Sequence, residues 1–232
     1  MSSTETTTSK TKQKLLESAG QVFAENGFSR STIREICDRA GTNVAAVNYY
    51  FRDKEELYRA VFDYAHKRVG EHILHAVGII ADSPPEEKLR TFVRAHLHSL
   101  LGTDGPPNWF STLVSREMIE PTHLQREMVE REIRPRSDML IGIIREMLGP
   151  GATEEQLRHC SLSVVSQSVF HKLAAPVIRT LHPEQTYTSD DLDRLAVHIA
   201  EFSLAGDRGP VPAPHRGSHA APDAGPAGGP GL

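Results

Sequence analysis

The chain of 232 residues has few of the residue types that build metal centres or disulfide-stabilised domains. It contains two cysteines, Cys37 and Cys160, which are far apart and outside any CxxC spacing. Neither a disulfide framework nor a zinc site is therefore predicted. No apolar run reaches the 18 residues that a membrane-spanning helix needs, and the N-terminal residues lack the apolar stretch of a signal peptide. We expect a cytoplasmic protein.

Sequence signatures of catalysis are also missing. There is no Gly-rich phosphate-binding loop, no G-x-S-x-G elbow and no H-E-x-x-H motif. The twelve histidines are scattered along the chain, and His72 and His75, three residues apart, have a spacing that can chelate a metal, but this pair alone predicts no metal site. We expect a protein that is not an enzyme and that uses no metal and no cofactor.

Helical periodicity of apolar residues runs along most of the chain, and no stretch shows the alternation of a half-buried strand. The sequence therefore predicts an all-α fold of about nine to ten helices, in which 38% hydrophobic residues supply a core. The last 27 residues contain seven glycines and six prolines, a composition that cannot bury enough surface to order itself. We expect four segments: a disordered arm (1–9), an N-terminal domain (10–56), a helical body (57–205) and a disordered tail (206–232).

Capping and breaking residues set the expected helix boundaries. The first helix is predicted from about Thr11 to Asn26, and a long connecting helix from Asp53 to about Ile80. Prolines then separate the helices of the body, because proline disrupts a helix interior. The expected helices there are 86–101, 109–119, 123–134, 136–148, 153–175 and 190–204.

The stretch from Ser31 to Tyr58 has the pattern of two short helices around a tight turn. Thr32 can cap the first helix and form a capping box with Glu35, and Gly41 can end that helix at positive φ. Asn43 can cap the second helix. Two short helices joined by a Gly-containing turn, with an apolar inner face, are typical of a helix-turn-helix, although a plain helical hairpin shares the same pattern.

The outer face of the second helix suits a DNA major groove. Its inner face is predicted to carry Val44 and Val47, which leaves small and amide side chains outside. Alanine methyl groups can approach thymine methyl groups, and asparagine can pair with base edges. Tyrosine and lysine at the end of the motif can reach phosphates. The predicted DNA-binding residues are Thr32, Arg34, Thr42, Asn43, Ala45, Ala46, Asn48, Tyr49, Tyr50 and Lys54.

Charge is distributed in a way that fits this interpretation. The window from Lys10 to Lys54 holds eight basic and five acidic residues, whereas the whole chain carries a net charge of −4. A positive N-terminal unit on an acidic body is typical of a DNA-binding head, here residues 10–56, attached to a body that does not bind DNA. We expect such a protein to be associated with the nucleoid.

The segment AGTNVAAVNYYFRDKEELY at Ala40–Tyr58 resembles the signature of the TetR family of bacterial transcriptional regulators. The matching residues are Ala40, Gly41, Tyr50, Phe51, Lys54, Glu55 and Leu57, and the upstream segment Leu16–Phe28 matches the family's first helix. Thr42, Asn43, Ala45 and Asn48 depart from the commonest choices and resemble the variant found in the CecR-like branch. These departures lie on the groove-facing surface, so they affect the operator sequence more than the mode of binding.

The resemblance implies a homodimer, formed by the last two helices (153–175 and 190–204), that binds a double-stranded, palindromic DNA operator. It also implies a small-molecule inducer bound between the middle helices, which would make the protein a ligand-released repressor. The residues predicted to line the pocket are Phe92, His96, Trp109, Phe110, Met118, Met128, Met139, Gln167, Phe170 and His171. Two alternatives stay open: a DNA-binding regulator controlled by a protein partner instead of a small ligand, and a helical adaptor or enzyme with a degenerate head.

Overall fold

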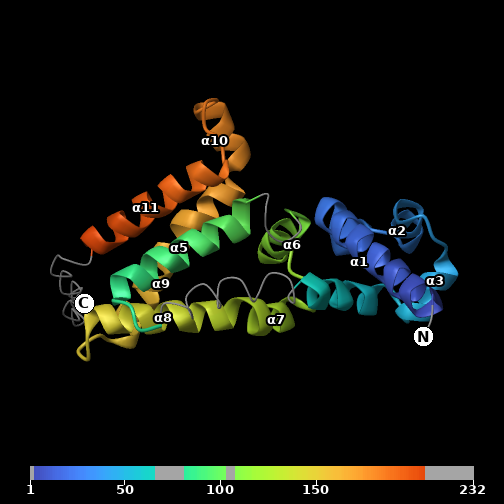
Figure 1. Cartoon of the computed structure of the whole chain (residues 1–232), viewed down its shortest axis with the longest axis horizontal. Coiled ribbons are helices and arrows are strands. Elements are labelled where there is room, and N and C mark those ends of the chain that lie inside the picture. Colours follow the sequence, from blue (N-terminus) through green and yellow to red (C-terminus); the bar gives the residue numbers. More distant parts are fainter. Residues whose placement is uncertain (1–2, 66–80, 103–107, 207–232) are drawn as a thin grey trace, which may run out of the picture.

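The computed structural model describes residues 3–65, 81–102 and 108–206. Within these ranges the fold is all-α, and no strand occurs. The molecule is elongated, with the N-terminal helices at one end and the C-terminal helices at the other (Figure 1). The prediction of an all-α protein is confirmed.

The N-terminal end is a head of four helices. It comprises α1 (Ser3–Arg30), α2 (Ile33–Ala40), α3 (Val44–Tyr50) and a further helix that begins at Lys54 and is described to residue 65. The remaining helices are α5 (Pro85–Leu101), α6 (Asn108–Ile119), α7 (Gln125–Met128), the π-helical turn η1 (Val129–Ile133), α8 (Arg134–Leu148), α9 (Glu154–Leu173), α10 (Ala175–Leu181) and α11 (Ser189–Gly206).

Two separate hydrophobic cores organise these helices. The first joins the four head helices to α6 and α7, and the second joins α5, α8, α9 and α11. The ring of Trp109 on α6 lies so close to Gly20 on α1 that a Cβ at that glycine would be 2.6 Å from it. The core of the head therefore includes helices that the sequence analysis placed in the body.

α1 differs from its prediction at the N-terminal end. It begins at Ser3, so residues 3–9, which we expected to be a disordered arm, are helical. No glycine or proline precedes Gly20, so nothing in the sequence interrupts the helix there. At the other end Gly27 leaves the helical conformation with φ 78°, close to the predicted end at Asn26.

Pro135 does not separate two helices as we predicted. α7, η1 and α8 follow one another without a break from residue 125 to 148, and Pro135 lies in the first turn of α8. Proline lacks an N–H and crowds the carbonyl four residues earlier, and the wider π-helical turn directly before it accommodates both effects.

The C-terminal helices agree with the sequence analysis except for one addition. Thr153 and Gln156 form the predicted capping box at the start of α9. Pro176, which we expected in a loop, instead occupies the first turn of α10, where its missing N–H costs nothing.

Two predicted segments fall outside the described residues. These are the continuation of the connecting helix from residue 66 to about Ile80 and the tail from residue 207 onwards. Across the described ranges, no helix combines the length and the apolar character that crossing a bilayer requires.

Candidate nucleic-acid interface

Local hydrogen bonds set the ends of α2 and α3. Thr32 Oγ1 accepts from the Glu35 N–H at 3.1 Å, and Gly41 has φ 64°, both as predicted. Glu35 does not close the capping box, because its carboxylate instead accepts from Asn26 Nδ2 at 2.8 Å. Asn43 Oδ1 accepts from the Ala46 N–H at 3.0 Å. The helix-turn-helix is therefore specified within a few residues of the turn.

Burial on one side fixes the orientation of α3. Val47 is fully buried, and Phe51, which follows the helix, is 4% exposed. Val44, which we predicted to face inward with Val47, is 46% exposed. Residues three apart on a helix differ in direction by about 60°, and in this seven-residue helix only Val47 is fully buried.

The outward side of α3 carries the predicted small and amide residues. Ala45 and Asn48 are exposed, whereas Ala46 is half-buried and packs against the head core. Tyr49 is 78% exposed, and its ring meets that of Tyr50 edge-on at 4.9 Å. This face therefore offers a methyl group, an amide and a phenol to a partner.

The side chain of Lys54 contacts other residues of the head, whereas we expected it to contact DNA phosphates. Its Nζ is 4.6 Å from the centroid of the Phe28 ring and donates to the Ser29 carbonyl at 3.4 Å. Burial lowers the pKa of this ammonium group. In this conformation Lys54 ties the start of its helix to the turn after α1.

The other predicted DNA-binding residues lie around the two helices. Thr32 and Arg34 are exposed at the start of α2. Thr42 is half-buried in the turn, where its N–H donates to the Cys37 carbonyl at 3.0 Å. The structure thus brings residues 42–49 together around α3, with Thr32 and Arg34 on the preceding helix.

Contacts distant in sequence hold the head in place. Arg39 on α2 forms two hydrogen bonds of 2.7 Å with the carboxylate of Glu25 on α1. Arg116 on α6 donates to the carbonyls of Ala24 and Glu25 near the end of α1, at 3.2 and 2.9 Å. No periodicity or motif signals these pairs, so the sequence analysis missed them.

A buried carboxylate connects α6 to the helix that follows α3. Glu117 is 2% exposed and accepts from the Tyr58 hydroxyl at 2.5 Å. It also accepts from Thr122, from the hydroxyl at 2.9 Å and from the N–H at 3.0 Å. Burial and the Glu117 carboxylate raise the pKa of the Tyr58 phenol well above its usual value, so Tyr58 remains a donor.

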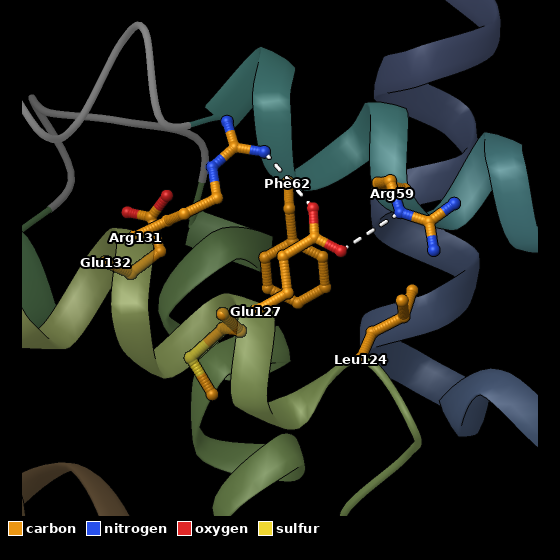
Figure 2. A pocket seen from close by; sticks show the side chains of 7 residues that line it. Arg59, Phe62, Leu124, Glu127, Arg131 and Glu132 are labelled. Carbon is orange, nitrogen blue, oxygen red and sulfur yellow. Dashed lines mark hydrogen bonds and ion pairs between the residues drawn. The ribbon is translucent and has the colours of Figure 1, made fainter.

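A chain of ion pairs makes a second connection to this helix. Figure 2 shows Glu127 of α7 between Arg59 of the head helix, at 3.0 Å, and Arg131 of η1, at 3.4 Å. Arg131 also pairs with Asp63 of the head helix. The gap among these side chains is about 10 Å³, enough for a water but not for a ligand.

The ten residues predicted to line a ligand pocket do not surround one cavity in the part of the chain that the structure describes. Trp109, Phe110 and Met128 belong to the head core, and Phe92 and Met139 belong to the second core. Met118 and Phe170 are 45% and 62% exposed. Helical periodicity places residues on faces but does not say which faces meet, so it could not group them correctly.

The last three predicted pocket residues also lie apart. His96 is buried in α5, and His171 lies 3.1 Å from the Tyr187 hydroxyl. Gln167 lines a groove of about 270 Å³ between α5, α8, α9 and α11. A second, more polar cleft of about 570 Å³ lies between the end of α1 and α6.

The head thus defines a helix-turn-helix protein of the DNA-binding class, with α3 as its recognition helix. Comparisons with known proteins agree. Residues 15–61 match the family model described as bacterial regulatory proteins of the tetR family, and residues 85–207 match the C-terminal domain of the HTH-type transcriptional dual regulator CecR. The chain belongs to the TetR family of transcriptional regulators and has a CecR-type C-terminal domain.

Individual relatives support the same assignment. The chain is 31% identical over 154 residues to the transcriptional dual regulator CecR of Shigella flexneri, covering 63% of this chain and 68% of that protein. It is 23% identical over 194 residues to the fatty acid metabolism regulator protein of Bacillus subtilis, covering 83% of this chain and 93% of that protein. The crystal structure of FadR from Bacillus subtilis in complex with stearoyl-CoA superimposes with a TM-score of 0.60 at 20% identity, covering 84% of this chain and 98% of that one.

Proposed function

We propose that this transcriptional regulator binds a palindromic operator as a homodimer, represses transcription and is released by a small organic effector. The geometry of α3 carries the proposal: a capped, short helix buried on one side presents Ala45, Asn48 and Tyr49 outward. Such a helix can enter a major groove and read base edges. A regulator of this kind acts where the bacterial chromosome lies, in the cytoplasm.

Exposed apolar side chains support the dimer. Most of the large apolar residues that are exposed in the described chain lie on the last three helices: Leu162, Phe170, Leu173, Val177, Leu181, Val197 and Phe202. Large exposed apolar side chains gathered on neighbouring helices are typical of an interaction site. A second copy packing on α9 and α11 would cover it and place two recognition helices about a two-fold axis.

Selection of bound sequences from a random DNA pool tests the proposal with the purified full-length chain. We expect a palindrome with two half-sites, separated by about one helical turn of DNA or more. If a confirmed dimer recovers no sequence at low salt, operator binding is wrong for this protein.

Two substitutions on α3 then separate its roles. Asn48→Ala should change base preference within the half-site, since a good amide–base pair discriminates by about 1–3 kcal/mol. Tyr49→Ala should weaken binding to all sequences alike, because a phosphate contact carries no sequence information. Binding isotherms on the selected operator and on single-base variants measure both effects. Equal effects of Asn48→Ala on every variant would contradict the assignment of Asn48 to base reading.

A further inference from the structure

The groove between α5, α8, α9 and α11 lies at the end of the molecule opposite the head, and we call it the distal groove (Figure 1). It measures about 270 Å³, close to the lower limit of about 300–1,000 Å³ for small-molecule sites. Apolar walls suit the apolar part of a small organic molecule. The large apolar side chains that line the distal groove are Leu89, Ile144, Met147, Leu148, Val164 and Phe202.

Three of the polar residues that line the distal groove are joined by hydrogen bonds. Gln167 Nε2 donates to Ser203 Oγ and to the Ser163 carbonyl, each at 3.2 Å. Both bonds use the donor group of the amide, so the Gln167 Oε1 atom can accept from a hydroxyl group in the groove. The distal groove therefore combines apolar walls with one polar side that holds an oriented amide.

Charge limits what can bind in this groove. None of the described residues that line it is charged. An ion bound there would exchange water for neutral walls without gaining an opposite charge, which is unfavourable. We propose that the distal groove is the effector site and binds an uncharged, largely apolar organic molecule whose hydroxyl group donates to Gln167. This inference rests on the proposed function in taking that molecule as the effector.

One uninterrupted helical segment connects the distal groove to the head. Residues 125–148 form α7, η1 and α8 without a break, and Figure 1 shows them running from the far end of the body to the head. Ile144 and Met147 line the groove near one end of this segment, and Met128 near its other end belongs to the head core. A molecule that displaces α8 at the groove therefore shifts the end that packs on the head.

The distal groove also adjoins the proposed dimer surface. Phe202 lines the groove and is one of the exposed apolar residues of α11. A molecule in the groove thus contacts both α8 and a helix that the second copy would cover. Binding that favours one arrangement of these helices would shift the spacing of the two heads and so the affinity for the operator.

The thiol of Cys160 provides a measure of occupancy, because this residue lines the distal groove and is half-buried. Cys37, the only other cysteine, is 2% exposed, and burial raises the pKa of its thiol. Since alkylating agents react with the thiolate, iodoacetamide should modify Cys160 much faster than Cys37. Mass spectrometry of peptides from the alkylated full-length chain measures both rates, with Cys37 as the internal reference.

The probe is 1-octanol, compared with octanoate and octylammonium at the same millimolar concentration. We expect 1-octanol to slow the alkylation of Cys160 several-fold, and the two ions of equal chain length to leave the rate unchanged. Absent protection by 1-octanol, or equal protection by either ion, overturns the proposal. If Cys160 is unreactive without any probe, the groove is already filled and the proposal is wrong. Reactivity that returns on dilution to the monomer would identify a second copy as the occupant, and reactivity that stays absent would indicate the chain's own residues.

Variants of α9 test the location by calorimetric titration with 1-octanol. Ser163→Trp should abolish binding, because the indole fills the groove. The matched control is Ser166→Trp, an exposed serine of the same helix outside the lining, which should bind as the wild type does. Gln167→Leu keeps the side-chain size and should weaken binding by about threefold to tenfold, the effect of one lost hydrogen bond. Unchanged binding by both Ser163→Trp and Gln167→Leu contradicts this site.

Operator selection needs no probe, so the two hypotheses can fail separately. If the wild type selects no palindrome but 1-octanol protects Cys160, the site is correct and the proposed regulatory function is wrong. If the wild type selects a palindrome and 1-octanol gives no protection, the regulatory function stands and the distal groove is not the effector site.

Discussion

Two glycines show how backbone conformation alone can decide the effect of one substitution. A Cβ added at Gly41 or at Gly142 would meet no atom within 4 Å. Gly41 has φ 64°, whereas Gly142 lies inside α8. The two positions therefore differ in strain but not in space.

We expect Gly41→Ala to destabilise the protein by about 1–2 kcal/mol, because the left-handed conformation is unfavourable for an L-residue. Gly142→Ala should stabilise it by about 0.5–1 kcal/mol through helix propensity. Urea unfolding of both variants measures the difference. If both substitutions changed the free energy of unfolding in the same direction, the left-handed turn between α2 and α3 would be contradicted.

The buried ring of His96 predicts a specific dependence of stability on pH. Its folded-state pKa of about 4 lies below the value of 6.5 for an exposed histidine. On acidification the unfolded chain binds this proton first, so the contribution of His96 to stability is intact above pH 6.5 and is lost as the pH falls towards 4. Between pH 7.5 and pH 5 the loss is about 2 kcal/mol.

His96→Leu should lack this component. The measurement is the free energy of unfolding of wild type and variant at the two pH values, and the expected result is a smaller pH dependence in the variant. An identical dependence would show that His96 titrates normally in the folded protein.

At the scale of elements, the contact between α6 and the helix after α3 includes one buried phenol as well as apolar packing. The Tyr58 hydroxyl donates to the buried Glu117, and Tyr64 on the same helix donates to Glu17 on α1 at 2.7 Å in a more exposed place. These two tyrosines form a matched pair, because each loses one hydroxyl on substitution by phenylalanine.

Tyr58→Phe should destabilise the protein by about 2 kcal/mol, since it removes a donor from a buried carboxylate. Tyr64→Phe should cost less, about 1 kcal/mol, because water can replace the lost donor at a half-exposed site. Thermal and urea unfolding provide the comparison. A larger loss from Tyr64→Phe would contradict the central place of Glu117 in this interface.

At the scale of the whole molecule, the apolar surface of α9 and α11 should determine the oligomeric state. Phe202 on α11 is 65% exposed, and Met118 on α6 is 45% exposed outside that surface. Phe202→Glu should give a monomer in analytical ultracentrifugation, because a carboxylate would be buried against the second copy. Met118→Glu should remain dimeric.

The monomeric variant should also lose operator affinity by at least tenfold, since one recognition helix reads too few base pairs. Electrophoretic mobility shifts on the selected operator measure this. A dimeric Phe202→Glu protein that binds normally would place the interface elsewhere.

Much of the head was predictable because its determinants are local. Thr32 and Asn43 cap helices through N–H groups three residues away, and Gly41 ends a helix by its own conformation. The contacts of Lys54 were not predictable, because Phe28 and Ser29 are 26 and 25 residues distant. The domain boundaries and the DNA-binding and ligand-binding residues remain predictions.

The sequence by itself determined the helical class, the helix-turn-helix and the family, because periodicity, caps and a motif of fixed spacing act over a few residues. Only the tertiary structure decided that α6 and α7 belong to the head core, that Glu117 meets Tyr58, and that the expected pocket residues lie apart. These outcomes depend on contacts between side chains that are distant in sequence, 59 residues in the Tyr58–Glu117 pair. Such contacts are set by how whole helices pack, which local patterns do not encode.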